Sequence, residues 1–528
     1  MLYAWDNATG SERWWAHNVS DLRRSLIRNT IYNVAGYFWT ILLGFLITPV
    51  IIHFVGFHTY GLYVAVGAAL GWLWLLDFGI SDAATRFMSG HAARGEEERF
   101  SACLSTALGL KLLLGLLIAG AAGLLAPSLA RHLGHPDGNE ASWVIRLMCW
   151  TYVVAQGSSV FNAALSARHR MDLPNRMGLL LSIPSTSAAI LLLIFQKSLA
   201  AYLLVVLVFS LVYFCLVVAA LRRIAPSVRF SPGLITRREL SELFGFARHQ
   251  SICRLADTFL ASADRLALSA DLKAVSLYQL GATLGAKIRD VSSLTVSAAL
   301  PTTTDLHARE DWPGLNQILR RGTKYLVLVS CPLFLFAALF AEELLTLWVG
   351  NPFAESAIVL RLLCAGYFLN VIAAMAASVG AAVNRLDLQV RASLTAIAAA
   401  VILYLTWGRH HGLPGLAASV ATGMAVLGVL LILFVLVALR SRLTLNLIDA
   451  FARPVMAVVL TALIGVPAKW MVLTHGWAST RLKAALFIGL IALLAAGLYP
   501  LVLRLTRTLD DYDVNILKGL FRRKVTSS

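Results

Sequence analysis

The sequence predicts an all-α polytopic membrane protein with about 14 transmembrane helices, and three observations support this fold class. Of the 528 residues, 58% are hydrophobic and only 14% are charged, whereas a soluble domain carries about 25% charged residues. The apolar residues occur in runs of about 20, the length that a helix needs to cross roughly 30 Å of hydrocarbon. The Lys and Arg residues behind the net charge of +17 lie mainly in short segments between these runs.

The apolar runs follow one another with short connections. In the first half of the chain the predicted spans are 29–54, 58–81, 101–126, 140–165, 174–195 and 199–221. In the second half they are 243–270, 277–300, 321–348, 355–383, 387–406, 413–439, 449–472 and 481–504. The longest inner connections, near 82–100, 222–242 and 301–320, are predicted to be polar linkers, and none is long enough for a folded soluble domain.

The basic residues predict the orientation of these spans. Loops rich in Lys and Arg stay in the cytoplasm because their translocation is unfavourable. The basic segments recur at every second loop and at both ends, which predicts a multi-pass inner-membrane protein with both termini cytoplasmic and an even number of spans. The positive charge is thereby explained by topology, and no nucleic-acid partner is expected.

The predicted organisation has two lobes and two further spans. Its parts are a cytoplasmic tail over 1–28, a first lobe of six spans over 29–221, a cytoplasmic linker over 222–242, a second lobe of six spans over 243–439, two spans over 440–504 and a cytoplasmic tail over 505–528. A short internal repeat supports the two lobes, because Leu62-Tyr63 followed by Gly67-Ala68 returns, with a shift of one residue, as Leu277-Tyr278 followed by Gly281-Ala282. Repeated six-helix units are common in transporters.

The predicted seventh span carries an unusual stripe of charge. Arg254, Asp257, Asp264 and Arg265 fall on one face of a helix with about 100° per residue. Each charge at mid-bilayer costs about 2.5–3.5 kcal/mol on insertion scales, so such a face must meet water or other polar groups. A helix that lies at the membrane interface is one alternative. If this segment did not cross the membrane, however, every later loop would lie on the side opposite to the one that its charge predicts. Structural ion pairs within the stripe are a second alternative.

Further charged residues at or near membrane depth complete the candidate site. The anion-binding candidates are Arg254, Arg265, Lys287, Arg289, Lys111, Arg146 and Arg28. The candidates for coupling to an ion are Asp257, Asp264, Asp290 and Asp77. On an ideal helix Arg289 projects away from Lys287 and Asp290. Because the deep cations outnumber the deep anions, the lumen is predicted to be positive and to suit a phosphate-bearing substrate.

No pattern in the sequence supports catalysis or a cofactor. The six cysteines lie far apart within apolar stretches, and neither they nor the histidines show metal-ligand spacing. A Walker A loop and a nucleophile–base pair are both missing from the sequence. We therefore expect no catalytic residue, no metal and no cofactor, and an integral-membrane polymerase or glycosyltransferase would need a large outer loop.

The motifs along residues 29 to 440 resemble those of a known family. In the first half they are Asn33, Gly36, Pro49, Gly56, Tyr60-Gly61-Leu62-Tyr63, Asp77-Phe78-Gly79 and Arg86. In the second half they are Asp264-Arg265, Leu277-Tyr278, Pro301, Leu347-Trp348-Val349-Gly350, Phe353-Ala354, Ala357 and Asn384-Arg385. This pattern resembles the bacterial O-antigen and exopolysaccharide flippases, the polysaccharide transporter branch of the MOP exporter superfamily.

The resemblance implies two six-helix lobes around a central cavity, alternating access, and an undecaprenyl-diphosphate-linked oligosaccharide as substrate. Membrane lipids, a polysaccharide polymerase and a chain-length regulator are the partners that it implies, and it matches Arg254, Arg265, Lys287 and Arg289 to the cationic lumen. A lipid II flippase is an alternative with a similar layout and cargo. A cation-coupled multidrug exporter is a weaker one, because a positive stripe disfavours organic cations.

Overall fold

The computed structural model describes residues 10–73, 79–133, 137–168, 170–243, 262–293, 299–351, 353–439, 448–463 and 481–506, together with 258, 259, 296, 443, 444, 508 and 513. These residues form helices and connecting loops, and no strand occurs among them. The contacts divide the chain into two compact units, Met1–Ser251 and Ile252–Ser528. The all-α fold class is therefore confirmed.

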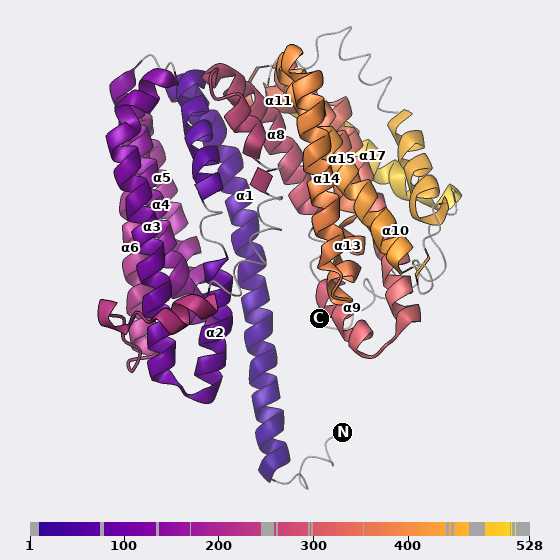
Figure 1. The fold of residues 1–528 in the computed structure, drawn as a ribbon. Coiled ribbons are helices and arrows are strands. Elements are labelled where there is room, and N and C mark those ends of the chain that lie inside the picture. The colour runs from indigo at the N-terminus through magenta and orange to yellow at the C-terminus, as the bar shows by residue number, and fades with distance from the viewer. Residues whose placement is uncertain are drawn as a thin grey trace. The chain divides into compact units, whose positions relative to one another are not determined.

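The first unit is a helical bundle that begins with a very long helix (Figure 1). Its helices are α1 (Gly10–Leu73), α2 (Ile80–Arg94), α3 (Glu97–His132), α4 (Gly138–Ala167), α5 (Asp172–Gln196) and α6 (Leu199–Ile224). Gly56 interrupts α1 with φ 80° and ψ 175°, a conformation that glycine adopts without a Cβ penalty. This kink separates the predicted spans 29–54 and 58–81.

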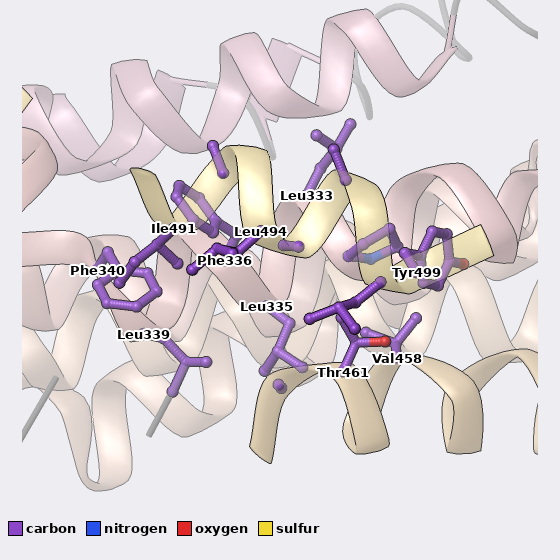
Figure 2. A pocket seen from close by; sticks show the side chains of 16 residues that line it. Leu333, Leu335, Phe336, Leu339, Phe340, Val458, Thr461, Ile491, Leu494 and Tyr499 are labelled. Carbon is purple, nitrogen blue, oxygen red and sulfur yellow. The ribbon is translucent and has the colours of Figure 1, made fainter. Parts of the chain in front are cut away.

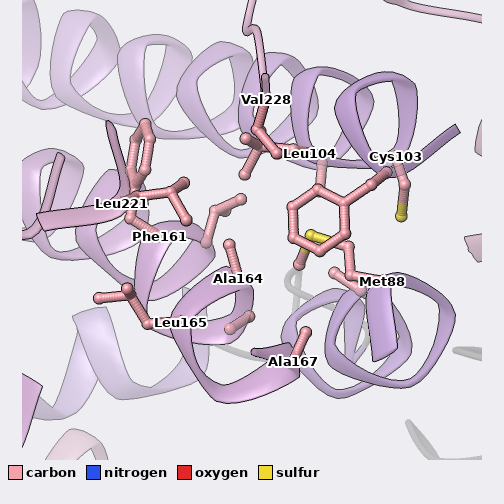
Figure 3. Packing of buried hydrophobic residues seen from close by; sticks show 14 of the residues in the cluster. Met88, Cys103, Leu104, Phe161, Ala164, Leu165, Ala167, Leu221 and Val228 are labelled. Carbon is pink, nitrogen blue, oxygen red and sulfur yellow. The ribbon is translucent and has the colours of Figure 1, made fainter. Parts of the chain in front are cut away.

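The packing of α2, α3, α4 and α6 gives the first unit its core (Figure 3). Met88 of α2, Leu104 of α3, Phe161 of α4 and Leu221 of α6 belong to one cluster of buried side chains. The Phe161 ring makes edge-to-face contacts with the rings of Phe214 and Phe230, and the ring centroids are 5.6 Å apart in both cases. The residues after α6 return to this core, because Val228 lies in the same cluster.

Among the described residues, the second unit contains more helices than the first, and two of its predicted spans are broken. They are α8 (Leu272–Ser293), α9 (Ala299–Ala308), α10 (Trp312–Leu339), α11 (Ala341–Val349), α12 (Ala354–Ile372), α13 (Ala374–Ala382), α14 (Leu386–Thr406), α15 (Gly412–Ala438), a helix ending at Leu463 and α17 (Arg481–Leu505). The predicted span 321–348 is broken at Phe340 between α10 and α11, and the span 355–383 at Ala373 between α12 and α13.

Nine of the described segments are long and apolar enough to cross a membrane. They are Leu43–Leu73, Glu97–His132, Asp172–Gln196, Leu199–Ile224, Trp312–Leu339, Ala354–Ala382, Leu386–Thr406, Gly412–Ala438 and Ala485–Leu505. The helices α4 and α8, which carry polar residues, are not among them. The predicted spans 243–270 and 449–472 lie partly outside the described residues, so the number of fourteen stays a prediction.

All three predicted polar linkers contain helical residues. The 222–242 segment contains the 3-10 helix Pro232–Leu234 and helical residues from position 237 onward. The 82–100 segment forms most of α2, which buries Ala83, Ala84 and Met88 and is bounded at both ends by glycines in the left-handed region. The 301–320 segment contains α9 and the start of α10. The prediction of polar linkers did not include these helices, because an amphipathic helix needs only one apolar face and shows no run of 20 apolar residues.

The two units repeat the same local contacts at an offset of 215 residues. Arg146 Nε donates to the Gly123 carbonyl at 3.4 Å, and Arg361 Nε donates to the Ala338 carbonyl at 3.3 Å (361 − 146 and 338 − 123). The same offset relates the Arg170–Asp172 ion pair to the Arg385–Asp387 pair. It also relates Leu62-Tyr63 to Leu277-Tyr278. The internal repeat in the sequence thus has a counterpart in the contacts within each unit.

Candidate functional site

Three charged residues in the C-terminal half of α8 form one cluster in the second unit. Asp290 Oδ2 lies 3.5 Å from Lys287 Nζ, and Asp290 Oδ1 lies 3.7 Å from Arg289 Nη2. Although Arg289 leaves the helix in another direction, its guanidinium reaches Asp290 and stacks over the Tyr367 ring at 5.0 Å. These three side chains are 26–30% exposed. Two cations therefore share one carboxylate in a cluster that an incoming ligand can reach.

A row of polar side chains extends this cluster along α8. Arg265 Nε donates to Gln279 Oε1 at 2.5 Å, and Gln279 Nε2 donates to Thr283 Oγ1 at 2.8 Å. Thr283 lies one helical turn before Lys287, since residues four apart share a helix face. The row from Arg265 to Asp290, which we call the α8 polar stripe, includes Gln279 and Thr283. Sequence reasoning missed these two, although the spacing 279, 283, 287 could have revealed them.

The side of α8 opposite the stripe packs against α12. A Cβ atom on Gly281 would lie 2.4 Å from the Ser356 carbonyl oxygen, and Ser356 Oγ donates to the Leu277 carbonyl at 2.7 Å. At about 100° per residue, Gln279, Thr283, Lys287 and Asp290 point away from Gly281. Because its glycine face is fixed against α12, α8 directs Gln279, Thr283, Lys287 and Asp290 away from α12. Arg289 instead turns back to stack on Tyr367 of α12.

The first unit buries a lysine that donates to three neutral oxygens. Lys111 of α3 is 2% exposed, and its ammonium donates to Ser81 Oγ at 2.5 Å, Ser159 Oγ at 2.7 Å and Gln156 Oε1 at 3.1 Å. Gln156 Nε2 in turn donates to Tyr152 Oη at 2.7 Å. Lys111 therefore ties α2, α3 and α4 together, and it is too deeply buried here to touch a ligand directly.

Of the remaining predicted site residues, Arg146 is separate from these two groups, Asp264 lies beside Arg265 of the stripe, and the others lie outside the described residues. Arg146 contacts the Gly123 carbonyl and stacks over the Trp143 ring at 5.5 Å. Asp264, which is 6% exposed, accepts from the backbone N–H of Arg265 at 2.8 Å. The structure does not describe Arg254, Asp257, Asp77 or the side chain of Arg28. In the described part of the chain no three His, Cys, Asp or Glu side chains gather as a metal site.

The bonds of Lys111 predict how its removal acts. Lys111→Ala deprives the buried Gln156 and the partly buried Ser81 and Ser159 of one donor, and leaving buried polar groups unsatisfied costs about 1–3 kcal/mol. Lys287→Ala is the control, because the Lys287 side chain is 29% exposed and its carboxylate partner is 3.5 Å away. Thermal unfolding of both purified variants should show a clearly lower melting temperature only for Lys111→Ala. Equal melting temperatures would show that the Lys111 bonds do not stabilise the bundle.

The model of a polysaccharide biosynthesis protein family matches residues 26–307, more than half of the chain. The chain belongs to this family. The resemblance predicted from its motifs is thereby confirmed. A search of curated proteins gave no match.

The fold of this polysaccharide biosynthesis protein is similar to that of transporters of known structure. A lipid II flippase MurJ, in an inward closed conformation, superposes with a TM-score of 0.69 at 12% identity, over 89% of this chain and 98% of that one. An inward-facing multidrug resistance MATE family transporter of the MOP superfamily gives a TM-score of 0.60 at 15% identity, over 78% and 95%. At such identities the likeness shows the fold, which is that of the MOP transporters.

Proposed function

We propose that this chain is a flippase that carries an undecaprenyl-diphosphate-linked oligosaccharide across the bacterial inner membrane for surface polysaccharide synthesis. The observation that carries the proposal is the α8 polar stripe, where Arg265, Lys287 and Arg289 lie within a bundle of apolar helices. Intramembrane ionisable residues are costly and usually mark a substrate or ion pathway. Membership of a polysaccharide biosynthesis family supports the saccharide nature of the cargo.

The chemistry of the stripe suits a diphosphate. A charged sugar diphosphate cannot enter hydrocarbon unaided, because losing its hydration is prohibitive. Arg presents a planar set of donors that matches phosphate oxygens, and Lys adds a mobile point charge. Asp290 is held at 3.5–3.7 Å from both cations, longer than a charge-assisted hydrogen bond of about 2.7–2.9 Å. A phosphate can therefore replace this carboxylate with shorter bonds.

An apolar pocket in the second unit suits the lipid part of such a substrate (Figure 2). It has a volume of about 390 Å³ and lies between α10, the helix ending at Leu463 and α17. Leu335 and Phe336 of α10 line it together with Val458, Leu494 and Tyr499. Because lipid tails are as apolar as these side chains, a prenyl chain can move from the bilayer onto such a surface without a desolvation cost. The second unit thus offers separate surfaces for charged and apolar groups.

The proposal includes a direction and an energy source. With both termini cytoplasmic and the cytoplasm negative, each negative charge moved outward gains about 2.3 kcal/mol per 100 mV. Asp264 and Asp290, and in the undescribed part Asp257 and Asp77, are the candidates to bind a counter-moving proton or cation. In this role the protein is a transporter rather than an enzyme, and it would serve a polysaccharide polymerase and a chain-length regulator.

The stripe is tested by charge substitutions. Arg289→Ala should abolish export of the surface polysaccharide, because it removes both the guanidinium beside Asp290 and its stacking on Tyr367. Lys287→Arg should keep export, since the positive charge stays. Arg409→Ala, at an exposed loop position where Arg409 Nε contacts His410, is the matched control. Export is measured as polysaccharide at the cell surface, and protein level in the membrane is measured alongside.

The cargo is tested in the deletion strain. We expect lipid-linked oligosaccharide to accumulate on the cytoplasmic leaflet and to disappear on complementation. Rescue of a strain depleted of its lipid II flippase would instead assign the peptidoglycan precursor as cargo. Transport of cationic dyes that survives Arg289→Ala would favour a multidrug exporter. Normal surface polysaccharide in the Arg289→Ala strain would contradict the role of the stripe.

A further inference from the structure

A polar pocket lies inside the first unit, whereas the α8 polar stripe belongs to the second. It has a volume of about 420 Å³ and is formed by α4, α5 and α6. Hydroxyl groups dominate its polar lining, with one amide and one phenol. These residues are Ser158, Ser159, Asn162, Ser182, Ser185, Ser210 and Tyr213. The volume lies within the range of about 300–1,000 Å³ that is typical of small-molecule sites.

The pocket faces the interior of the bundle rather than the surrounding lipid. On α6 the strongly exposed apolar residues include Leu204, Val208 and Leu211, at 45–50% exposure, whereas Ser210 and Tyr213 line the pocket. At about 100° per residue these two sets lie on opposite sides of the helix. On α5 the pocket-lining Ser182 and Ser185 likewise lie away from Leu180 and Leu191. A lipid tail is therefore not the expected occupant.

The hydrogen bonds inside the pocket leave both donors and acceptors for a ligand. Ser158 and Ser210 donate to the carbonyls of Val154 and Val206, one turn earlier in their own helices. A hydroxyl that donates in this way keeps lone pairs to accept. Tyr213 Oη donates to Asn162 Oδ1 at 3.1 Å, which leaves the Asn162 amide nitrogen to donate. Among the described residues the Ser185 hydroxyl makes no hydrogen bond.

Two bonds at the border fix the shape of the pocket. Trp39 Nε1 of α1 donates to Ser182 Oγ at 2.5 Å. Lys111 Nζ donates to Ser159 Oγ at 2.7 Å, so the buried ammonium orients a hydroxyl that lines the pocket without entering it. Phe209 adds an aromatic ring to the lining. Uncharged donors and acceptors beside aromatic rings match a sugar ring, whose hydroxyls both donate and accept and whose C–H faces are apolar.

We propose that this pocket binds a neutral sugar residue of the saccharide that the protein carries. The inference rests on the proposed function and deepens it, because it assigns the saccharide to the first unit and leaves the charged diphosphate to the α8 polar stripe. It also gives Lys111 a positioning role that acts through Ser159. The predicted site residues of the first unit did not include the serines, since hydroxyls on an apolar helix are usually satisfied by their own backbone.

Water access to the pocket provides the first test. In a variant without its native cysteines, Ser185→Cys should react with a charged methanethiosulfonate reagent that does not enter lipid. The control retains only Cys215, which is exposed on the outer side of α6. We expect reaction at position 185 and none at position 215. Failure of Ser185→Cys to react in active protein would overturn the proposal, because a sugar site must be open to water.

Ligand protection provides the second test. Lipid-linked oligosaccharide extracted from the deletion strain should slow labelling of Ser185→Cys at least tenfold, whereas undecaprenyl diphosphate without sugar should not. Equal protection by both lipids would show that the pocket does not recognise the saccharide. If neither protects while the variant still exports polysaccharide, the pocket assignment fails and the proposed function stands. If the lipid-linked oligosaccharide neither binds the purified protein nor accumulates in the deletion strain, the proposed function itself fails.

A bulky substitution gives an independent readout. Ser185→Phe fills the pocket and should reduce polysaccharide export at least tenfold, while Val208→Phe on the opposite side of α6 should leave export unchanged. The Lys287 and Arg289 sites are intact in both variants, so binding of undecaprenyl diphosphate should remain equal. Normal export by Ser185→Phe, with the protein present at its usual level, would contradict the sugar pocket.

Discussion

Gly281→Ala is expected to destabilise the second unit by about 1–3 kcal/mol, the usual cost of overpacking a close contact. The added Cβ would lie 2.4 Å from the Ser356 carbonyl oxygen and 3.0 Å from the Leu360 backbone nitrogen. Both are backbone atoms of α12, so relief requires the two helices to separate rather than a side chain to rotate. Because α8 carries the polar stripe, the same displacement should reduce polysaccharide export.

The internal repeat supplies a matched control for this substitution. Gly67 belongs to the similar Gly-Ala motif of α1, one residue out of register with the offset of 215, and its added Cβ would meet only the flexible end of Met148 at 3.7 Å. Without a clash, Gly→Ala in a helix is favourable by up to about 1 kcal/mol. Thermal unfolding of the two purified variants should therefore shift in opposite directions. An equal fall in melting temperature at both positions would show that the contact between α8 and α12 is not unusually close.

Asp513→Ala is expected to cost about 3–5 kcal/mol, the range measured when one partner of a buried ion pair is removed. The Asp513 side chain is 2% exposed and lies 2.7 Å from Lys324 Nζ and 3.0 Å from Arg321 Nη1. Tyr325 Oη also donates to Asp513 Oδ1 at 2.5 Å. Removing the carboxylate leaves the Lys324 ammonium, only 9% exposed, without this anion.

An exposed ion pair provides the control for Asp513. Asp387 lies 2.9 Å from Arg385 Nε, with the two side chains 41% and 42% exposed. Such a surface pair is worth about 0–1 kcal/mol, so Asp387→Ala should change the melting temperature little. Limited proteolysis should cut the C-terminal residues faster in Asp513→Ala alone. If the two variants melt alike and are cut at the same rate, Asp513 does not anchor the C-terminal segment to α10.

The C-terminal segment illustrates a limit of sequence reasoning. Residues 505–528 are predicted to be a cytoplasmic tail on the basis of their basic residues alone, and nothing in them marks Asp513. The partners of Asp513, namely Arg321, Lys324 and Tyr325, lie nearly 190 residues earlier in the chain. A contact between such distant positions depends on how helices pack, which the local pattern of apolar and charged residues does not encode.

The candidate site was only partly predictable for the same reason. Charge at membrane depth identified Lys287, Arg289, Asp290 and Lys111, because an ionised group among apolar residues stands out in any sequence. The structure shows that these residues differ in kind, since Lys111 is 2% exposed and bonded to neutral oxygens whereas Lys287 is 29% exposed beside Asp290. Neutral partners such as Ser159 give no comparable signal.

The sequence by itself determined that this protein is helical and lies in a membrane, because the length and apolarity of each span are local properties set by the thickness of hydrocarbon. It also revealed the family, through motifs spread along the chain. Only the tertiary structure decided that the glycines of α8 pack against α12, that Lys111 is buried, and that serines from three helices share one pocket. These features depend on which helix faces meet, and helix packing brings together residues that no local pattern relates.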